Sequence, residues 1–186
     1  MSDYLDDDDV KVLNFSDSKS SSDDVEELID DVQEQKQNGN LDKARQLGED
    51  LAGEVDSNDG EFIFGLDQQE SGDIICQRRL LLAFVVTYGL DRFCVNSLIA
   101  KTAQNTFLET IQQSSPSIYK DINQQGAFSY YYLCVRDGET PADGVGKTFA
   151  ELCGRKGDCV YAKLGAALYE YFLTVVEQRV ISLRFQ

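Results

Sequence analysis

A short glycine-rich segment, GVGKT at residues 144–148, ends like a phosphate-binding P-loop. That loop has the pattern Gly-x-x-x-x-Gly-Lys-Ser/Thr, and its backbone N–H groups surround the phosphates of a nucleotide. Here the first glycine position holds Pro141, which has no N–H to donate. Only 38 residues follow Thr148, too few for the further strands and the magnesium-binding aspartate of a nucleotide-binding sheet. A nucleotide-dependent enzyme therefore ranks last among the functions considered.

The same residues fit the start of a helix better. Thr140 suits the N-cap, Pro141 suits the first helical position, and Asp143 faces the positive end of the helix. Gly144 and Gly146 weaken such a helix by about 1 kcal/mol each relative to alanine, so we expect a neighbouring helix to pass close to them. The apolar residues of the predicted buried face follow at helical spacing: Ala142, Val145, Phe149 and Leu152.

Two cysteines flank a basic turn in the segment CGRKGDC, residues 153–159. Cys153 lies at the end of one predicted helix, and Cys159 begins the next. Arg155 and Lys156 lie between them, and both positive charge and a helix N-terminus lower the pKa of a thiol. The pattern predicts a redox-responsive pair, a thiol enzyme through Cys159, or a small anion site on the helix N-terminus. The alternative is an exposed turn between cysteines that act as small hydrophobic residues.

Aromatic residues gather in the segment AFSYYYLC at residues 127–134. Phe128 and Tyr131, together with Phe149, are the candidate lining of a ligand pocket, because tyrosine combines apolar area with a hydroxyl group. Core packing is the ordinary role of such residues. A helical sensor that binds a small ligand is therefore the second functional hypothesis.

Acidic residues dominate the first 70 positions, where 22 Asp and Glu face 5 Lys and Arg. The other 116 residues carry 11 acids and 12 bases, so the net charge of −16 arises entirely in the first part. Nucleic acids and anionic membranes are bound through clustered Lys and Arg, so we expect neither as a partner. An acidic region favours a protein partner with a basic surface. The residues predicted to engage it are Asp6, Asp7, Asp8, Asp9, Asp23, Asp24, Glu26, Glu27, Asp30 and Asp31.

Composition also limits the chemistry that the chain can do. Without histidine it lacks the commonest general base near neutral pH and most catalytic zinc sites. No pair of carboxylates has a catalytic spacing, so we predict no catalytic residue, metal site or cofactor. Five cysteines without a Cys-x-x-Cys pair indicate free thiols in a reducing compartment. The N-terminus lacks a signal-peptide pattern and the most apolar run, residues 80–90, is shorter than a membrane span, so a cytoplasmic protein is expected.

The front of the chain divides by composition into three parts. Residues 1–22 are rich in Asp and Ser and are predicted to be a disordered arm. Residues 23–55 are predicted to form an acidic helical hairpin, in which Gly39 ends the first helix and Asn40 caps the second. Residues 56–72 are predicted to be a linker loop. A calcium-binding loop is the alternative there, but its glycine falls one position too early.

Residues 73–186 are predicted to form a body of four or five helices. Gly89 is expected to end the first of them, and Asp158 to cap the last, which runs from residue 159 to about 184. Residues 117–136 are assigned as helix, with a strand as the alternative because of their aromatic and β-branched content. Charged residues recur every seven positions on the solvent side of the last helix: Lys163, Glu170, Glu177 and Arg184.

The sequence as a whole predicts an all-α protein, with an acidic hairpin attached to a bundle-like body. Ala44, Gly48 and Ala52 lie four residues apart and form a ridge of small side chains, so another helix is expected close to the hairpin. The leading hypothesis is a non-enzymatic interaction or regulatory protein that engages a basic partner through its acidic N-terminal region. The sequence predicts no particular oligomeric state.

Overall fold

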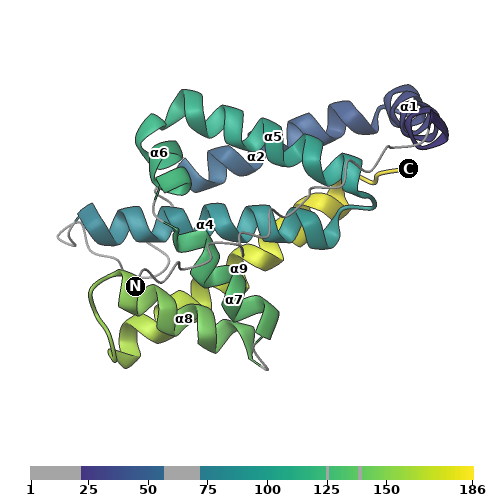
Figure 1. Ribbon diagram of the computed structural model, residues 1–186. Helices are drawn as coiled ribbons and strands as arrows, with labels where there is room; N and C mark the ends of the chain where they lie inside the picture. Colours follow the sequence, from purple (N-terminus) through teal and green to yellow (C-terminus); the bar gives the residue numbers. More distant parts are fainter. Residues whose placement is uncertain (1–21, 57–71, 125, 138–139) are drawn as a thin grey trace, which may run out of the picture.

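The computed structural model describes residues 22–56, 72–124, 126–137 and 140–186, which form eight α-helices and no strand (Figure 1). The all-α class is therefore confirmed for these residues. The predicted arm and linker, with the candidate calcium loop, lie outside the described residues except at the ends of neighbouring helices. The helices are α1 (Ser22–Gln37), α2 (Asn40–Asp56), α4 (Gly72–Phe93), α5 (Ser97–Ser114), α6 (Pro116–Gln124), α7 (Ala127–Asp137), α8 (Pro141–Leu152) and α9 (Cys159–Ser182).

Helix α4 lies at the centre of the molecule (Figure 1). The pair α2 and α5 packs on one side of it and the pair α8 and α9 on the other, while α6 and α7 cover its remaining surface. Leu80 to Val86 are all buried, which explains why this stretch is apolar all round and not only along one stripe. The position of α4 therefore follows from its composition.

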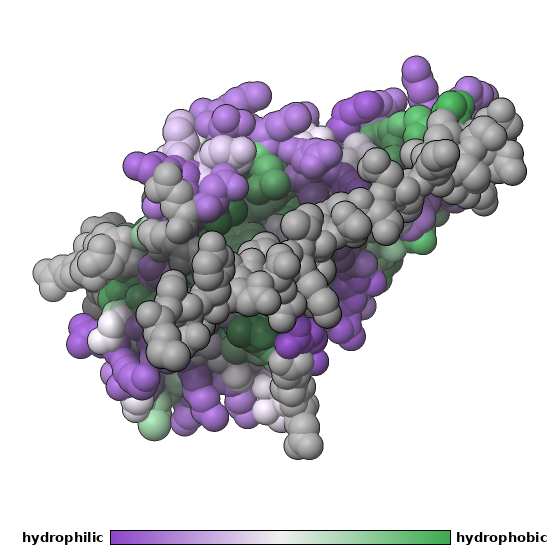
Figure 2. All heavy atoms as spheres, viewed as in Figure 1, coloured by the Kyte–Doolittle hydropathy of each residue, from purple (hydrophilic) through white to green (hydrophobic). Residues whose placement is uncertain are grey.

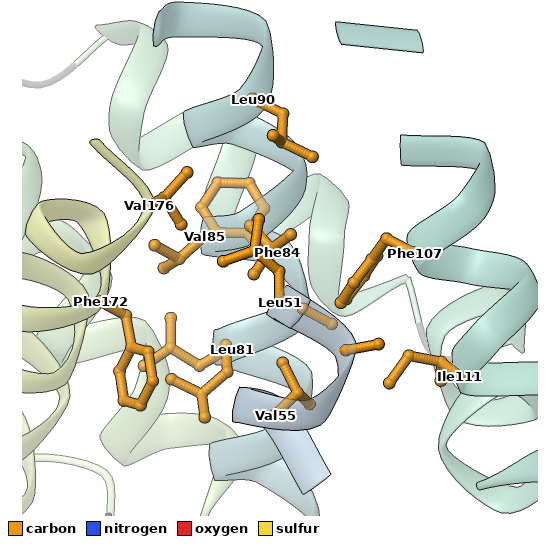
Figure 3. Close-up of a cluster of buried hydrophobic side chains, with 14 of the residues drawn as sticks. Leu51, Val55, Leu81, Phe84, Val85, Leu90, Phe107, Ile111, Phe172 and Val176 are labelled. Atoms are coloured by element: carbon orange, nitrogen blue, oxygen red, sulfur yellow. The ribbon is translucent and has the colours of Figure 1, made fainter. Parts of the chain in front are cut away.

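A single hydrophobic core joins the predicted hairpin to the predicted body. Leu51 and Val55 of α2 meet Phe107 of α5 and Phe84 of α4, and side chains of α9 complete the cluster (Figure 3). Each of the four is fully buried. Residues 40–55 thus contribute to the same interior as residues 81–180, whereas α1 packs chiefly against α2.

The ridge of small residues on α2 is where another helix approaches, as predicted. A Cβ added to Gly48 would lie 2.5 Å from the carbonyl oxygen of Ala103 and 2.8 Å from the backbone nitrogen of Phe107, both in α5. Ala44 and Ala52, one turn to either side, are buried as well. Glycine at position 48 is therefore what allows the two backbones to pack so closely.

The body contains six helices in its described residues, so the prediction of four or five was wrong. The predicted helix end at Gly89 was also wrong, because α4 continues to Phe93. Gly89 is buried, and a Cβ there would lie 2.9 Å from Val176 of α9. This glycine makes room for a crossing helix. The next helix begins only at Ser97, where the side chain of Asn96 accepts a hydrogen bond from the backbone N–H of Ile99.

Residues 116–124 and 127–137 form two short helices, so the helical assignment is confirmed and the strand alternative is wrong for these residues. Pro116 begins α6, and Gly126 precedes α7 with a φ of +61°, a backbone conformation that glycine adopts without steric cost.

The last helix, α9, begins at the predicted cap but ends at Ser182, two residues earlier than expected. Lys163, Glu170 and Glu177 are exposed, as the seven-residue spacing predicts. Among the described residues, α9 is also the helix long and apolar enough to cross a bilayer by length and composition alone. Here its buried residues, such as Leu168, pack within the core, against α8 and α4.

Candidate functional site

Helix α1, which carries the acidic candidates from Asp23 to Asp31, lies at one edge of the described part of the molecule. Helix α1 occupies that edge in Figure 1, and Figure 2 shows hydrophobic atoms reaching the surface there beside hydrophilic ones. Asp30 and Asp31 are exposed, and the neighbouring Ile29 is 48% exposed. Residues 23–27 belong to α1, but their side chains are outside the described set, and Asp6 to Asp9 lie entirely outside it.

The glycines of the P-loop-like segment serve helix packing. Gly144 and Gly146 lie within α8, and the N–H of Gly144 donates to the carbonyl of Thr140, 3.3 Å away. A Cβ on Gly146 would collide with the backbone of Ala162 in α9, and one on Gly144 would lie 3.2 Å from Cβ of Cys134 in α7. The close neighbours expected for both glycines are therefore present. Pro141 begins the helix as predicted, although Thr140 makes no side-chain capping bond.

The basic turn keeps its two cysteines in different environments. Cys153 is half-buried against the core, whereas Cys159 is exposed at the first position of α9. The carboxylate of Asp158 accepts hydrogen bonds from the backbone N–H groups of Val160 and Tyr161, at 2.8 and 3.4 Å. An anion at this N-terminus would have to displace that carboxylate. None of the five cysteines, all of which the structure describes, forms a disulfide, as the sequence predicts.

A cavity of about 370 Å³ lies between the end of α8 and the start of α9. Lys156 forms an ion pair with Glu151 at 2.5 Å, which raises the pKa of the lysine. The two lysines and two carboxylates that line the cavity balance in charge, so it has no strong preference for an anion. The redox and anion roles stay predictions. The lining residues are Lys147, Ala150, Glu151, Lys156, Gly157, Asp158, Cys159 and Ala162.

The predicted aromatic pocket residues pack in the core. Tyr131 and Phe149 are fully buried, and Phe128 is half-buried. The ring of Phe84 lies 5.3 Å from that of Tyr131 and 5.8 Å from that of Phe128. A ligand could contact Tyr131 or Phe149 only after the helices around them had moved. Within the part of the chain that the structure describes, this packing does not favour the ligand-sensor alternative, which stays a prediction.

Asn40 has a role that the sequence analysis missed. Predicted as a helix cap, it is instead the first residue of α2, and its side chain is fully buried. Its amide nitrogen donates to the carbonyl of Gln186 and to the side chain of Gln35, both at 2.7 Å. Its amide oxygen accepts from the backbone N–H of Gln186 at 3.1 Å. No local pattern indicates this contact, because Gln186 is 146 residues away.

No known protein family matches this chain. No curated protein and no solved structure shows significant similarity to it either. The arrangement of its own residues therefore carries the functional argument.

Proposed function

We propose that this protein is a non-enzymatic interaction protein whose acidic N-terminal region binds a protein partner with a basic surface. The observation that carries the proposal is the placement of α1 at the edge of the molecule, packed chiefly against α2 (Figure 1). Its sequence, SDDVEELIDDVQEQKQ, contains seven acidic residues and one basic residue. A helix of this charge, with few contacts to the body, is suited to meet a basic surface.

Apolar side chains of α1 would add to the electrostatic attraction between this helix and the partner. Ile29 is 48% exposed between the acidic positions of α1, and Val32, three residues on, is only partly buried. Amphipathic helices commonly bind by laying such residues into an apolar groove of the partner. The partner expected for α1 is therefore a groove with an apolar floor and Lys or Arg along its rim.

A defined basic peptide tests the proposal. A synthetic peptide of about 20 residues offers the same chemistry as that groove, because Leu at helical spacing forms an apolar stripe for Ile29 and Lys on either side meets the acids. We expect it to bind the full chain, with an affinity that falls as salt is raised. The double variant D30K/D31K should bind about tenfold more weakly, a difference of about 1.4 kcal/mol. Fluorescence anisotropy of the labelled peptide measures both affinities.

A matched control variant distinguishes the effect of where the acidic residues lie from the effect of the net charge of the protein. E170K/E177K alters two exposed acids of α9 and raises the net charge from −16 to −12, as D30K/D31K does. Its affinity should stay within about twofold of the wild type, because rim charges act locally at physiological salt. Equal losses in both variants would mean that the peptide responds only to net charge, and the proposal would be wrong.

A further inference from the structure

The last residues of the chain form a strap across the turn between α1 and α2. Beyond α9, Leu183 and Phe185 are partly buried against the core, whereas Arg184 and Gln186 are exposed. The carbonyl of Arg184 accepts a hydrogen bond from Nζ of Lys43 at 2.9 Å. We call residues 183–186 the strap. It joins the end of α9 to the beginning of α2.

Asn40 connects this strap to α1. Its amide pairs with both the N–H and the carbonyl of Gln186, much as a neighbouring backbone would. The same amide nitrogen also donates to Oε1 of Gln35, in the last turn of α1. One buried amide thus links three segments, and its side-chain oxygen and nitrogen both have partners. Losing one link leaves a buried polar group without its partner, so the three contacts stabilise one another.

Part of what holds the strap is exposed to solvent. Arg184 and Gln186 are exposed, and the bond from Lys43 is exposed to solvent; solvent-exposed backbone hydrogen bonds are a feature of segments that open locally. In addition, Arg184 has a φ of +46°, a left-handed conformation that is sterically unfavourable for arginine. The strap therefore stores backbone strain that its opening relieves.

We propose that the strap controls the release of α1: while Asn40 holds Gln186, α1 stays against α2, and when the strap opens, α1 becomes free to enter a partner's groove. The inference rests on the proposed function, since α1 is the helix offered to the partner. Closure keeps Val32 partly buried against the core. Opening adds this side chain to the exposed Ile29, so the open state presents a larger apolar surface and binds a groove more tightly.

Hydrogen exchange of the full chain tests the strap without any partner. In Asn40→Ala we expect the amides of α1 to exchange about tenfold faster, while those of α8 keep their wild-type rates. Asn96→Ala is the matched control, because the side chain of Asn96 caps α5 by accepting from the N–H of Ile99 and makes no bond to the strap that holds Asn40. Arg184→Gly should act in the opposite direction and slow exchange in α1, because glycine accepts the left-handed backbone while the carbonyl bonded by Lys43 is kept.

Two results would overturn the inference: equal exchange of α1 in Asn40→Ala and Asn96→Ala, or faster exchange in Arg184→Gly. If Asn40→Ala does not fold, Arg184→Gly and Lys43→Met decide the question, with slower and faster exchange expected respectively. With the basic peptide as probe, Asn40→Ala should bind about threefold more tightly than the wild type. A peptide that binds neither protein contradicts the proposed function alone, because the exchange rates still decide whether the strap holds α1.

Discussion

At the scale of single residues, the hydroxyl of Tyr131 stands out because it is buried and has no hydrogen-bond partner among the described residues. Burial, together with the nearby thiols of Cys153 and Cys134, raises the pKa of this phenol far above its usual value. A buried polar group without a partner costs about 1–3 kcal/mol. Tyr131→Phe should therefore raise the free energy of unfolding by about 1 kcal/mol, as measured by urea denaturation. A clear loss of stability would show that the hydroxyl has a partner, such as a bound water.

Tyr169 is the opposite case, since its hydroxyl is hydrogen-bonded to Tyr88 and burial raises its pKa to about 12. Between pH 10 and 12 the unfolded chain loses this proton while the folded protein keeps it, so stability falls as pH rises. We expect the free energy of unfolding to drop by about 1 kcal/mol between pH 10 and 11 from this residue. Cys94, with a pKa raised to about 11 by burial and by Asp91, acts in the same direction.

The variant Tyr169→Phe checks this assignment. It should be less stable than the wild type at pH 7, because it loses the bond to Tyr88, yet its stability should depend less on pH above 10. Urea denaturation at pH 7, 10 and 11 measures both effects. An unchanged slope above pH 10 would assign the alkaline sensitivity to other groups.

At the scale of helices, replacing either of two glycines of α2 by alanine should change the free energy of unfolding, in opposite directions for the two positions. Gly48→Ala places a methyl group 2.5 Å from a carbonyl of α5, so we expect a loss of about 2–3 kcal/mol in the free energy of unfolding. Gly53→Ala has no atom within 4 Å of the new Cβ, so the better helix propensity of alanine should add about 0.5–1 kcal/mol. Chemical denaturation of both variants measures the difference. A stabilising Gly48→Ala would contradict the close contact of α2 with α5.

The same helices show which features a sequence can predict. The start of α9 and the ridge on α2 were predictable, because an N-cap and a four-residue spacing of small side chains are local patterns. The role of Gly89 was not predictable, because a glycine that ends a helix cannot be distinguished in sequence from one that leaves space for a side chain such as Val176. The bond from Asn40 to Gln186 depends likewise on a residue far along the chain. Local sequence patterns therefore predicted where helices begin and which faces are small. They did not predict which distant residues those helices contact, because that depends on tertiary packing.

At the scale of the whole molecule, charge and packing are divided differently. The hydrophobic core runs from α2 to α9 without a break, whereas the excess negative charge is confined to the first 70 residues. Helix α2 belongs both to the hydrophobic core and to the acidic first 70 residues. Its inner face is buried in the core, and its outer face carries exposed acids such as Glu49 and Asp50. A partner that neutralised the acidic region would therefore also relieve repulsion on a helix of the core. Partner binding and stability are expected to be coupled.

This division of charge predicts how salt affects stability. The ion pairs Asp42–Arg45 and Glu54–Arg179 join side chains that are at least 35% exposed, so each contributes at most about 1 kcal/mol that salt can remove. Repulsion among the acids of α1 and α2 is spread over many pairs, and salt screens it as the Debye length falls from about 30 Å at 0.01 M to about 3 Å at 1 M. We therefore expect the Tm to rise by a few degrees between 0.01 and 0.5 M NaCl, since about 1 kcal/mol shifts the Tm of a chain this size by about 2–4 °C.

The charge variants that test partner binding also decide where this repulsion acts. In D30K/D31K the salt-dependent rise in Tm should be smaller than in the wild type, because two of the repelling acids have become attractive. In E170K/E177K, which has the same net charge, the rise should be nearly unchanged, since α9 lies outside the acidic region. Circular dichroism melts at the two salt concentrations measure all three proteins. A Tm that falls with salt in the wild type would mean that attractive ion pairs, and not repulsion in the N-terminal region, dominate the electrostatics of the fold.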